Sequence, residues 1–197
     1  MKVSKQQMAD NRERIVDAAA RLFRERGFDG IGVADLMKAA GLTHGGFYGH
    51  FASKEDLMAQ AVERSMVRGH ELVAQLAEGT PGDTGAQLAA VTGWYLSCSH
   101  RDDLGNGCAV AALGADAGRQ GPGVRKAVTE GLRAFVDLLA RLVPGRDATE
   151  RRQRALASYA AMVGALVLAR AADDEALSRE VLEAVRATLP ATGQASP

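Results

Sequence analysis

Apolar side chains recur at helical spacing along nearly the whole chain, in segments separated by short clusters of glycine, proline and aspartate. Spacings of three and four residues place such side chains on one face of an α-helix. Of the 197 residues, 37 are alanine, the strongest helix former, whereas the β-branched and aromatic residues that favour strands are sparse. We therefore predict an all-α fold of about nine helices.

The longest expected helix, over residues 53–78, opens with Ser53 and Asp56 in capping-box spacing. It carries apolar residues on two adjacent faces, so we expect it to bridge two cores. Residues 190–197 are expected to form a disordered tail. The expected helices are 7–26, 33–40, 44–50, 53–78, 84–99, 108–119, 124–143, 148–171 and a last one that is capped by Asp173 or Asp174 and ends at Leu189.

Length and composition argue against several classes of protein. A chain of 197 residues can form one globular unit or two small ones. The longest apolar run, Ala160 to Ala169, is shorter than the roughly 18 to 20 residues of a membrane-spanning helix, which argues against a transmembrane protein. The first residues lack the apolar core of a secretion signal, and two cysteines are too few to staple the chain. We expect a cytoplasmic protein.

The net charge of zero conceals an asymmetry along the chain. Residues 1–54 carry nine basic and six acidic side chains, a net charge of +3, and the remainder carries fifteen and eighteen, a net charge of −3. Within the basic part, Phe47 and Phe51 are four residues apart and are expected to face inward. His44 and Tyr48 share a different face, so the exposed side of this short helix is predicted to be polar and aromatic.

Two features of this region favour a partner that carries phosphate groups. Gly45, Gly46 and Gly49 each weaken a helix by about 0.8 to 1 kcal/mol relative to alanine, but they let a macromolecule approach the backbone closely. Lys54 occupies the first turn of the next helix, where the helix dipole disfavours a cation unless an anion binds there as well. A DNA phosphate would explain both features. The alternative is that the glycines form a tight helical corner and that Lys54 is simply solvated.

The stretch from Gly27 to Leu57 closely resembles the DNA-binding segment of TetR-family repressors. The matching motifs are VADL at 33–36, AAGLT at 39–43, HGGFYGHF at 44–51 and SKEDL at 53–57. The resemblance implies a helix-turn-helix domain over residues 1–52, a helical effector-binding and dimerisation domain over 53–189, and double-stranded operator DNA as the partner. It also implies that the helix at 44–50 enters the major groove, with His44 and Gly45 nearest the bases and further DNA contacts from Thr43, Tyr48, His50 and Lys54.

The sequence departs from the family pattern at two places. Ile31 and Gly32 stand where many relatives have a hydroxyl residue that caps the next helix, and His44 stands where lysine is frequent. These departures predict weaker anchoring of phosphates.

Members of this family are symmetric dimers whose last two helices form a four-helix bundle, so the resemblance implies a homodimer. The sequence supplies suitable residues, because Leu177, Val181 and Val185 recur every fourth residue and the helix that contains Val163 and Leu166 is apolar nearly all round. A two-fold dimer would place two recognition helices about 34 to 36 Å apart, as a near-palindromic operator requires. The alternative is that both helices only complete the core of a monomer.

By the same resemblance, the middle of the chain should hold an effector. Large apolar and aromatic residues there could line a cavity, and a few polar residues could orient the ligand. Each of them could equally belong to the core. The candidates are Trp94, Tyr95, Leu96, Leu113, Phe135 and Met162, with Cys98, Ser99, His100 and His70 as the polar or thiol groups.

Cys108 is the most specific candidate for sensing. Asn106 is expected to cap the helix that Cys108 begins, so the helix dipole and the nearby Arg101 could favour the thiolate. The run from Gly107 to Asp116 also resembles a branch of TetR-like repressors with a cysteine at this point, which electrophiles or oxidants modify in some members. A buried, apolar cysteine is the alternative. A disulfide with Cys98 would require Cα atoms within about 7 Å.

We therefore predict a dimeric transcriptional repressor that responds to a small-molecule or electrophile effector, is not an enzyme and needs no cofactor. Three other functions stay open. A thiol enzyme would use Cys108 with His100 as the base. A metal sensor would use Cys98, His100 and Cys108 as ligands, although no strong zinc spacing is present. A structural DNA-binding protein would bind every sequence with similar affinity.

Overall fold

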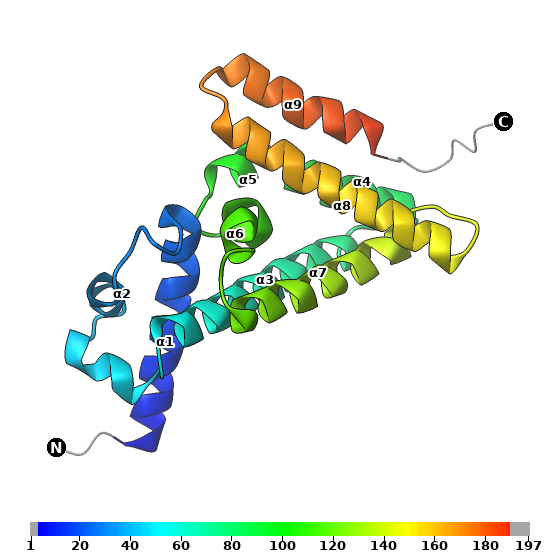
Figure 1. Ribbon diagram of the computed structural model, residues 1–197. Coiled ribbons are helices and arrows are strands. Elements are labelled where there is room, and N and C mark those ends of the chain that lie inside the picture. Colours follow the sequence, from blue (N-terminus) through cyan, green and yellow to red (C-terminus); the bar gives the residue numbers. More distant parts are fainter. Residues whose placement is uncertain (1–3, 190–197) are drawn as a thin grey trace. The chain divides into compact units, whose positions relative to one another are not determined.

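The computed structural model describes residues 4–189, which contain α-helices, one 3-10 helix and no strand (Figure 1). The all-α prediction is confirmed. The tail predicted at 190–197 lies outside the described residues. The helices are α1 (Lys5–Arg26), α2 (Val33–Ala39), η1 (His44–Gly49), α3 (Lys54–Glu78), α4 (Thr84–Tyr95), α5 (Cys98–Asp102), α6 (Ala109–Ala117), α7 (Pro122–Leu142), α8 (Ala148–Ala171) and α9 (Glu175–Thr188).

The described chain divides into two compact units. Unit 1 consists of residues 4–67 and 104–130, and unit 2 consists of residues 68–103 and 131–189. Helix α3 begins in unit 1, where it buries Leu57 and Val62, and ends in unit 2, where it buries Val73. Its predicted bridging role is thereby confirmed. This division differs from the domains expected on either side of residue 52, because α6 and the first parts of α3 and α7 pack with the three N-terminal helices.

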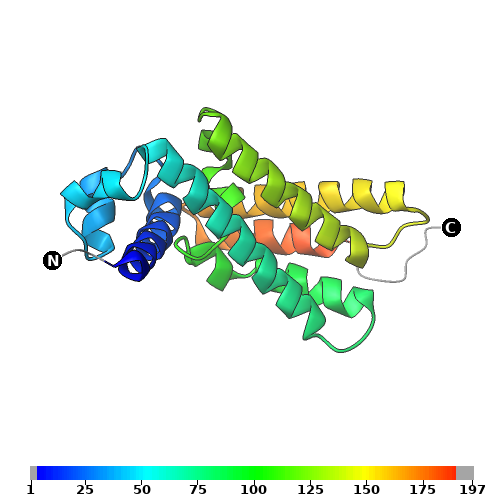
Figure 2. The ribbon, with the colours of Figure 1, turned by 90° about the horizontal axis from the view of Figure 1, so that it is seen from below.

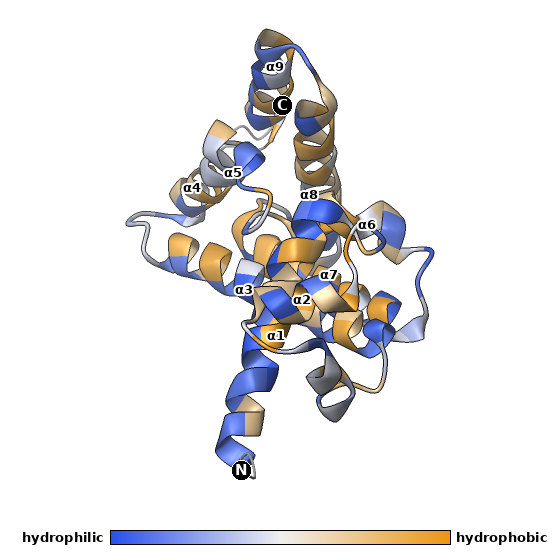
Figure 3. Cartoon of the chain, turned by 90° about the vertical axis from the view of Figure 1, so that its left-hand side faces the viewer, coloured by the Kyte–Doolittle hydropathy of each residue, from blue (hydrophilic) through white to orange (hydrophobic). Residues whose placement is uncertain are grey.

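Helix α1 shows how local sequence determines the start of unit 1. Ser4 caps the helix, and its hydroxyl accepts the amide of Gln7 at 3.1 Å. Gly27 ends it with a φ of 74°, in the left-handed region, while its amide donates to the Phe23 carbonyl at 2.8 Å. The N-terminal part of α1 is largely hydrophilic (Figure 3), and the later turns bury Ile15 and Phe23 completely.

One apolar core joins the helices of unit 1. Leu36 of α2, Phe47 of η1, Leu57 of α3 and Leu113 of α6 are all buried in the cluster that contains Phe23. The starts of α3 and α7 lie side by side (Figures 1 and 2), and a Cβ added to Gly123 would contact the Ala59 side chain at 3.4 Å. The three N-terminal helices therefore share their core with α6 and with the first turns of α3 and α7.

Unit 2 has an aromatic core and ends in a pair of packed helices, α8 and α9. The rings of Phe135 and Tyr159 stack with centroids 4.5 Å apart, and Tyr95 packs edge-on against both. The predicted caps of the last two helices are confirmed, because Asp147 accepts the Glu150 amide at 2.9 Å and Asp174 accepts two amides of α9.

The region between residues 95 and 109 differs from the sequence prediction. Helix α4 ends at Tyr95 instead of Ser99, because Ser97 adopts an extended conformation and starts the short helix α5. The Ser97 hydroxyl accepts the His100 amide at 3.2 Å, so the first residues of the predicted polar loop are helical. The next helix, α6, begins at Ala109 with Cys108 as its cap, and the prediction that Asn106 is the cap was wrong.

Helix α8 is long and apolar enough by composition to cross a membrane, and it is the one such helix among residues 4–189. The sequence argument considered only unbroken apolar runs and therefore did not identify this helix. A helix in the core of a globular protein has the same composition, and Ala155, Tyr159, Met162 and Leu166 of α8 are buried inside unit 2.

Candidate nucleic-acid interface and effector region

The segment at 44–50, predicted as a helix, is a 3-10 helix, η1, that ends at Gly49. Its inward face is aromatic. Phe47 is fully buried and Phe51 is nearly so, with ring centroids 5.6 Å apart, which confirms the prediction that both face inward. The guanidinium of Arg12, in α1, lies 4.9 Å from the centre of the Phe51 ring and covers that ring. The segment is therefore anchored at its middle and just beyond its end.

The outward face of η1 is open to solvent, as the spacing predicted. His44 and Gly45 are exposed, and Tyr48 has 75% of its surface accessible, the largest exposure of any large apolar or aromatic side chain among residues 4–189. A Cβ added to Gly45 or Gly49 would meet no atom within 4 Å. The packing of this chain therefore does not require glycine at these positions, which leaves the approach of a partner as a reason for it.

The remaining predicted DNA contacts lie at the two edges of η1. Thr43 precedes the segment in an extended conformation, is exposed, and makes no capping hydrogen bond with its side chain. His50 follows it and is half-buried. The Lys54 ammonium donates to the Phe28 carbonyl at 2.6 Å, so this cation already has an acceptor within unit 1. A lysine has three N–H donors, and the prediction that Lys54 binds a phosphate stays open.

The departure from the family pattern at Ile31 and Gly32 leaves α2 without a side-chain cap. Gly32 is the residue before α2, and it supplies no side-chain hydrogen bond to the free amides of that helix. Ile31 is buried in the core. Helix α2 is instead held by its apolar residues Leu36 and Met37, both fully buried.

The predicted effector residues are divided between the two units. Trp94, Tyr95, Cys98 and His100 belong to unit 2, whereas Cys108 and Leu113 belong to unit 1. Leu113 is buried in the core of unit 1 beside α1, and its role in lining an effector cavity stays a prediction. The other apolar candidates, Leu96, Phe135 and Met162, are buried in unit 2.

His100 is held inside the aromatic core of unit 2. Its ring stacks on Trp94 with centroids 4.5 Å apart, and its Nδ1 lies 2.7 Å from the Tyr95 carbonyl oxygen. Burial lowers the pKa of His100 below its ordinary value, and the neighbouring Arg170 acts in the same direction, although the bond to the Tyr95 carbonyl opposes both. The side chain is therefore a structural part of the core, which disfavours its use as a base for Cys108.

Arg101, which was expected to favour a thiolate at Cys108, has its described bonding partners within unit 2. Its guanidinium is buried in unit 2, where it bonds to Asp102 at 2.7 Å, to Ser178 at 2.8 Å and to Glu175 at 3.0 Å. The Ser178 hydroxyl in turn donates to the Ala169 carbonyl at 2.6 Å. The bonds from Arg101 lower the pKa values of Asp102 and Glu175 and connect α5 to the start of α9.

Cys108 itself lies at the first turn of a helix, as predicted, but as the cap residue. Its Sγ accepts the amide of Ala111 at 3.5 Å, and the side chain is half-buried. Both cysteines are free thiols. The loop before Cys108 is attached to α1, because the Arg24 guanidinium donates from Nε to the Gly105 carbonyl at 2.8 Å and also from Nη2.

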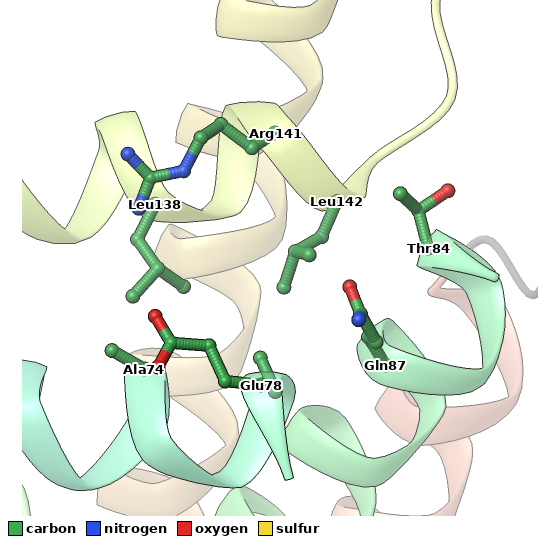
Figure 4. Close-up of a pocket in the computed structure, with 8 residues that line it drawn as sticks. Ala74, Glu78, Thr84, Gln87, Leu138, Arg141 and Leu142 are labelled. Atoms are coloured by element: carbon green, nitrogen blue, oxygen red, sulfur yellow. The ribbon is translucent and has the colours of Figure 1, made fainter. Parts of the chain in front are cut away.

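Unit 2 contains a cavity of about 250 Å³ that the sequence analysis missed. Figure 4 shows Leu138 and Leu142 of α7 pointing toward the end of α3 and the start of α4. The Glu78 carboxylate and the Gln87 amide lie at the side of the cavity. No local sequence pattern marks such a site, because its residues come from three helices. They are Ala74, Ala77, Glu78, Thr84, Gln87, Leu138, Arg141 and Leu142.

The predicted dimerisation residues differ in exposure. Leu166 is fully buried within the chain, so its assignment to a dimer surface is corrected, because it packs on the core side of α8. Leu177 is 49% exposed, and Val163, Val181 and Val185 are half-buried. The exposed large apolar side chains of α8 are instead Leu156, Val167 and Leu168, which the sequence pattern did not single out.

The metal-sensor alternative finds no site in the described residues. Between residues 4 and 189, no three histidine, cysteine, aspartate or glutamate side chains are close enough to hold a metal ion together. The proposed ligands Cys98 and His100 belong to unit 2, and Cys108 belongs to unit 1.

Known proteins resemble this chain over both units. A family model described as bacterial regulatory proteins, tetR family, matches residues 15–61. The HTH-type transcriptional repressor NemR of Escherichia coli is 28% identical over 168 residues, covering 82% of this chain and 84% of NemR. The crystal structure of the reduced form of E. coli NemR has a TM-score of 0.78 at 26% identity and covers 91% of this chain and 95% of that one. A TetR transcriptional regulator from Chloroflexus aurantiacus has a TM-score of 0.77 at 28% identity, covering 93% and 94%.

Proposed function

Because the chain belongs to the TetR family of bacterial transcriptional regulators, we propose that it is a cytoplasmic, dimeric repressor that binds two-fold symmetric operator DNA through η1. The observation that carries this proposal is the exposed face of η1. Tyr48 and His44 project from a short, glycine-rich helix that Phe47 and Phe51 fix to the core. A short helix that displays a phenol and an imidazole, with Gly45 and Gly49 beside them on its open side, suits close approach to base edges in a major groove.

The local charge supports the same assignment. Residues 1–54 have a net charge of +3 although the whole chain is neutral, and nucleic-acid binding requires only a local excess of cations near the duplex. Thr43 and Lys54 flank η1 and are the proposed phosphate contacts, while His44, Gly45, Tyr48 and the half-buried His50 face the groove. Tyr48 suits either a phosphate or a base, because its hydroxyl can donate and accept a hydrogen bond.

The exposed apolar residues of α8 and α9 support a dimer. Leu156, Val167 and Leu168 of α8 and Leu177 of α9 have 43–61% of their surface accessible. Large apolar side chains gathered on one pair of helices are unusual for a monomer and suit a second copy of the same helix pair, because a two-fold interface places the same patch on both sides. Val163, Val181 and Val185 complete the proposed interface.

Two ways of releasing the DNA are proposed. A thiol response would act at Cys108, whose sulfur caps α6, so that its modification changes the start of that helix. A ligand response would use the cavity in unit 2, which at about 250 Å³ is smaller than the roughly 300–1,000 Å³ of typical ligand pockets and so accepts only a small molecule. A thiol enzyme has less support, because His100 is buried against Trp94 and the Tyr95 carbonyl.

The proposal is tested by titrating operator DNA, selected beforehand from random duplexes, with wild-type protein and the Tyr48→Ala variant. We expect the variant to bind about 5- to 150-fold more weakly, since a single groove contact contributes about 1–3 kcal/mol. Its urea unfolding curve should match that of the wild type, because Tyr48 is 75% exposed. Leu104→Ala, at a 40% exposed residue of the same unit, is the matched control and should bind normally. Equal affinities of the wild type and Tyr48→Ala would refute the assignment of η1 to DNA.

A further inference from the structure

The loop before Cys108 is fixed to the end of α1, which also supports the recognition segment. Gly105 is buried, and its carbonyl accepts two hydrogen bonds from the Arg24 guanidinium, one of them 2.8 Å long from Nε. A Cβ on Gly105 would lie 2.6 Å from the Glu25 carboxylate and 3.0 Å from Cγ of Arg21. The backbone of the loop therefore rests directly on the last turn of α1, and Arg24 is the side chain that binds it.

The same end of α1 is connected to the other parts of unit 1 that carry DNA-contact residues. Four residues after Arg24, the Phe28 carbonyl accepts the ammonium of Lys54 at 2.6 Å, which attaches the start of α3. Phe28 and Ile31 are buried in the cluster that contains Phe47 of η1. A displacement of the turn from Arg24 to Phe28 would therefore reach η1 through packed side chains and one hydrogen bond.

Cys108 is placed to start such a displacement. It follows Gly105 by three residues, and its sulfur caps α6 through the Ala111 amide. Helix α6 is anchored in the unit 1 core by Leu113 and Ala117. Because α6, on the C-terminal side of Cys108, is held by these buried residues, we expect a larger or charged group on the sulfur to displace the loop on its N-terminal side, which contains Gly105.

We propose that Arg24 is the positioning residue that couples the N-terminal end of α6 to the recognition segment η1, by way of the Gly105 carbonyl. This inference rests on the proposed function, because it assigns a route to the release of DNA when Cys108 is modified. Arg24 contacts neither DNA nor effector in this account. Its removal should leave operator binding by the reduced protein nearly unchanged and should remove the response.

The coupling is measured without a chemical modifier by a double-mutant cycle of Cys108→Glu and Arg24→Met. Cys108→Glu places a long, charged side chain at the cap. In free full-length protein, followed by hydrogen exchange and mass spectrometry, we expect it to accelerate exchange in peptides covering residues 28–51 about fivefold or more. In the Arg24→Met background the same substitution should have less than about half of this effect.

Two further variants separate positioning from general stability. Arg21→Met removes a neighbouring arginine of α1 that pairs with Glu25 and donates no bond to the Gly105 carbonyl, so the cycle with Cys108→Glu should behave as in the wild type. Arg24→Lys keeps a cationic donor and should restore part of the coupling. If Arg24→Met fails to fold, Arg24→Ala takes its place in the cycle, since an undiminished effect of Cys108→Glu in that background overturns the proposal.

The thiol response is tested in parallel with N-ethylmaleimide on a Cys98→Ser background, by measuring the affinity for selected operator DNA. If alkylation of Cys108 weakens binding in this background and not when Arg24→Met is added, the coupling is supported. If alkylation has no effect but the hydrogen-exchange cycle is non-additive, thiol release fails and the coupling stands. If alkylation releases DNA equally with and without Arg24, the coupling is overturned and thiol release stands.

Discussion

Unit 1 and unit 2 bury and expose different kinds of side chain. The core of unit 1 is almost purely apolar, and Ser65, which bonds to the Ala61 carbonyl of its own helix, is the one buried polar residue among residues 4–67 and 104–130. Unit 2 buries Thr92, His100, Arg101, Ser158 and Ser178, and four of its large apolar residues on α8 and α9 are exposed. The comparison indicates that the core of unit 1 is held mainly by apolar packing, with its polar bonds nearer the surface, while unit 2 also has polar bonds inside its core.

The largest expected effect tests the apolar core of unit 1. Phe23→Ala should lower the free energy of unfolding by about 3–5 kcal/mol, because a fully buried aromatic ring is removed and leaves a cavity. The measurement is urea unfolding followed by circular dichroism. Tyr48→Ala removes an aromatic side chain that is 75% exposed in the same unit and should change the value by less than about 0.5 kcal/mol. Similar losses for the two variants would contradict the picture of a core held by close packing.

The exposed apolar face of unit 2 is tested by Leu168→Glu. A charge on a 61% exposed residue of α8 should hardly affect folding of the protomer but should raise the dimer dissociation constant about a hundredfold, because the charge is buried at the interface. Analytical ultracentrifugation over a range of concentrations measures this constant. Leu104→Glu adds the same charge at an exposed leucine of unit 1 and should leave the dimer intact. If both variants dimerise like the wild type, the partner surface lies elsewhere.

The buried polar bonds of unit 2 are tested by Arg101→Met. The substitution leaves the Ser178 hydroxyl without this donor, while Asp102 and Glu175 are largely solvent-exposed and regain water, so we expect a loss of about 1–3 kcal/mol in unfolding free energy. Arg179→Met removes the other arginine that bonds to Glu175. Because Arg179 is 60% exposed, this substitution should lower the free energy of unfolding by less than about 0.5 kcal/mol. A neutral Arg101→Met would show that the polar bonds of unit 2 are incidental.

The smallest expected effect is a pH dependence from His100. Its pKa is lowered mainly by burial, so the unfolded chain takes up a proton at a higher pH than the folded chain does. Stability from neutral His100 is therefore complete above about pH 6.5 and is lost as the pH falls below that value, with a slope of at most about 1.4 kcal/mol per pH unit. Urea unfolding at pH 7.5, 6.5 and 5.5 measures it. His100→Phe keeps a ring against Trp94 and should reduce the slope, whereas an unchanged slope would assign it to other groups.

Features that depend on neighbouring residues could be predicted from the sequence. The caps Ser53, Asp147 and Asp174 and the inward pair Phe47 and Phe51 follow from spacings of three or four residues, and the structure has all of them. Helical periodicity also identified the long helix α3 and its two apolar faces.

Features that depend on distant residues could not be predicted. The partners of Arg101, at Glu175 and Ser178, are more than 70 residues away in the sequence, so no local pattern indicates them. Leu166 and its neighbour Val167 are equally apolar, and only packing decides that the first is buried and the second exposed. The cavity in unit 2 combines side chains of α3, α4 and α7 and has no local signature.

The central claim, that two copies of η1 read duplex DNA together, is tested most directly by selecting bound sequences from a pool of random duplexes with purified wild-type protein. The account predicts enrichment of a two-fold symmetric site whose half-sites are about one helical turn apart, and weaker retention of that site by the Tyr48→Ala variant under the same conditions. Recovery of no preferred sequence at low salt, or equal retention of the site by both proteins, would contradict it.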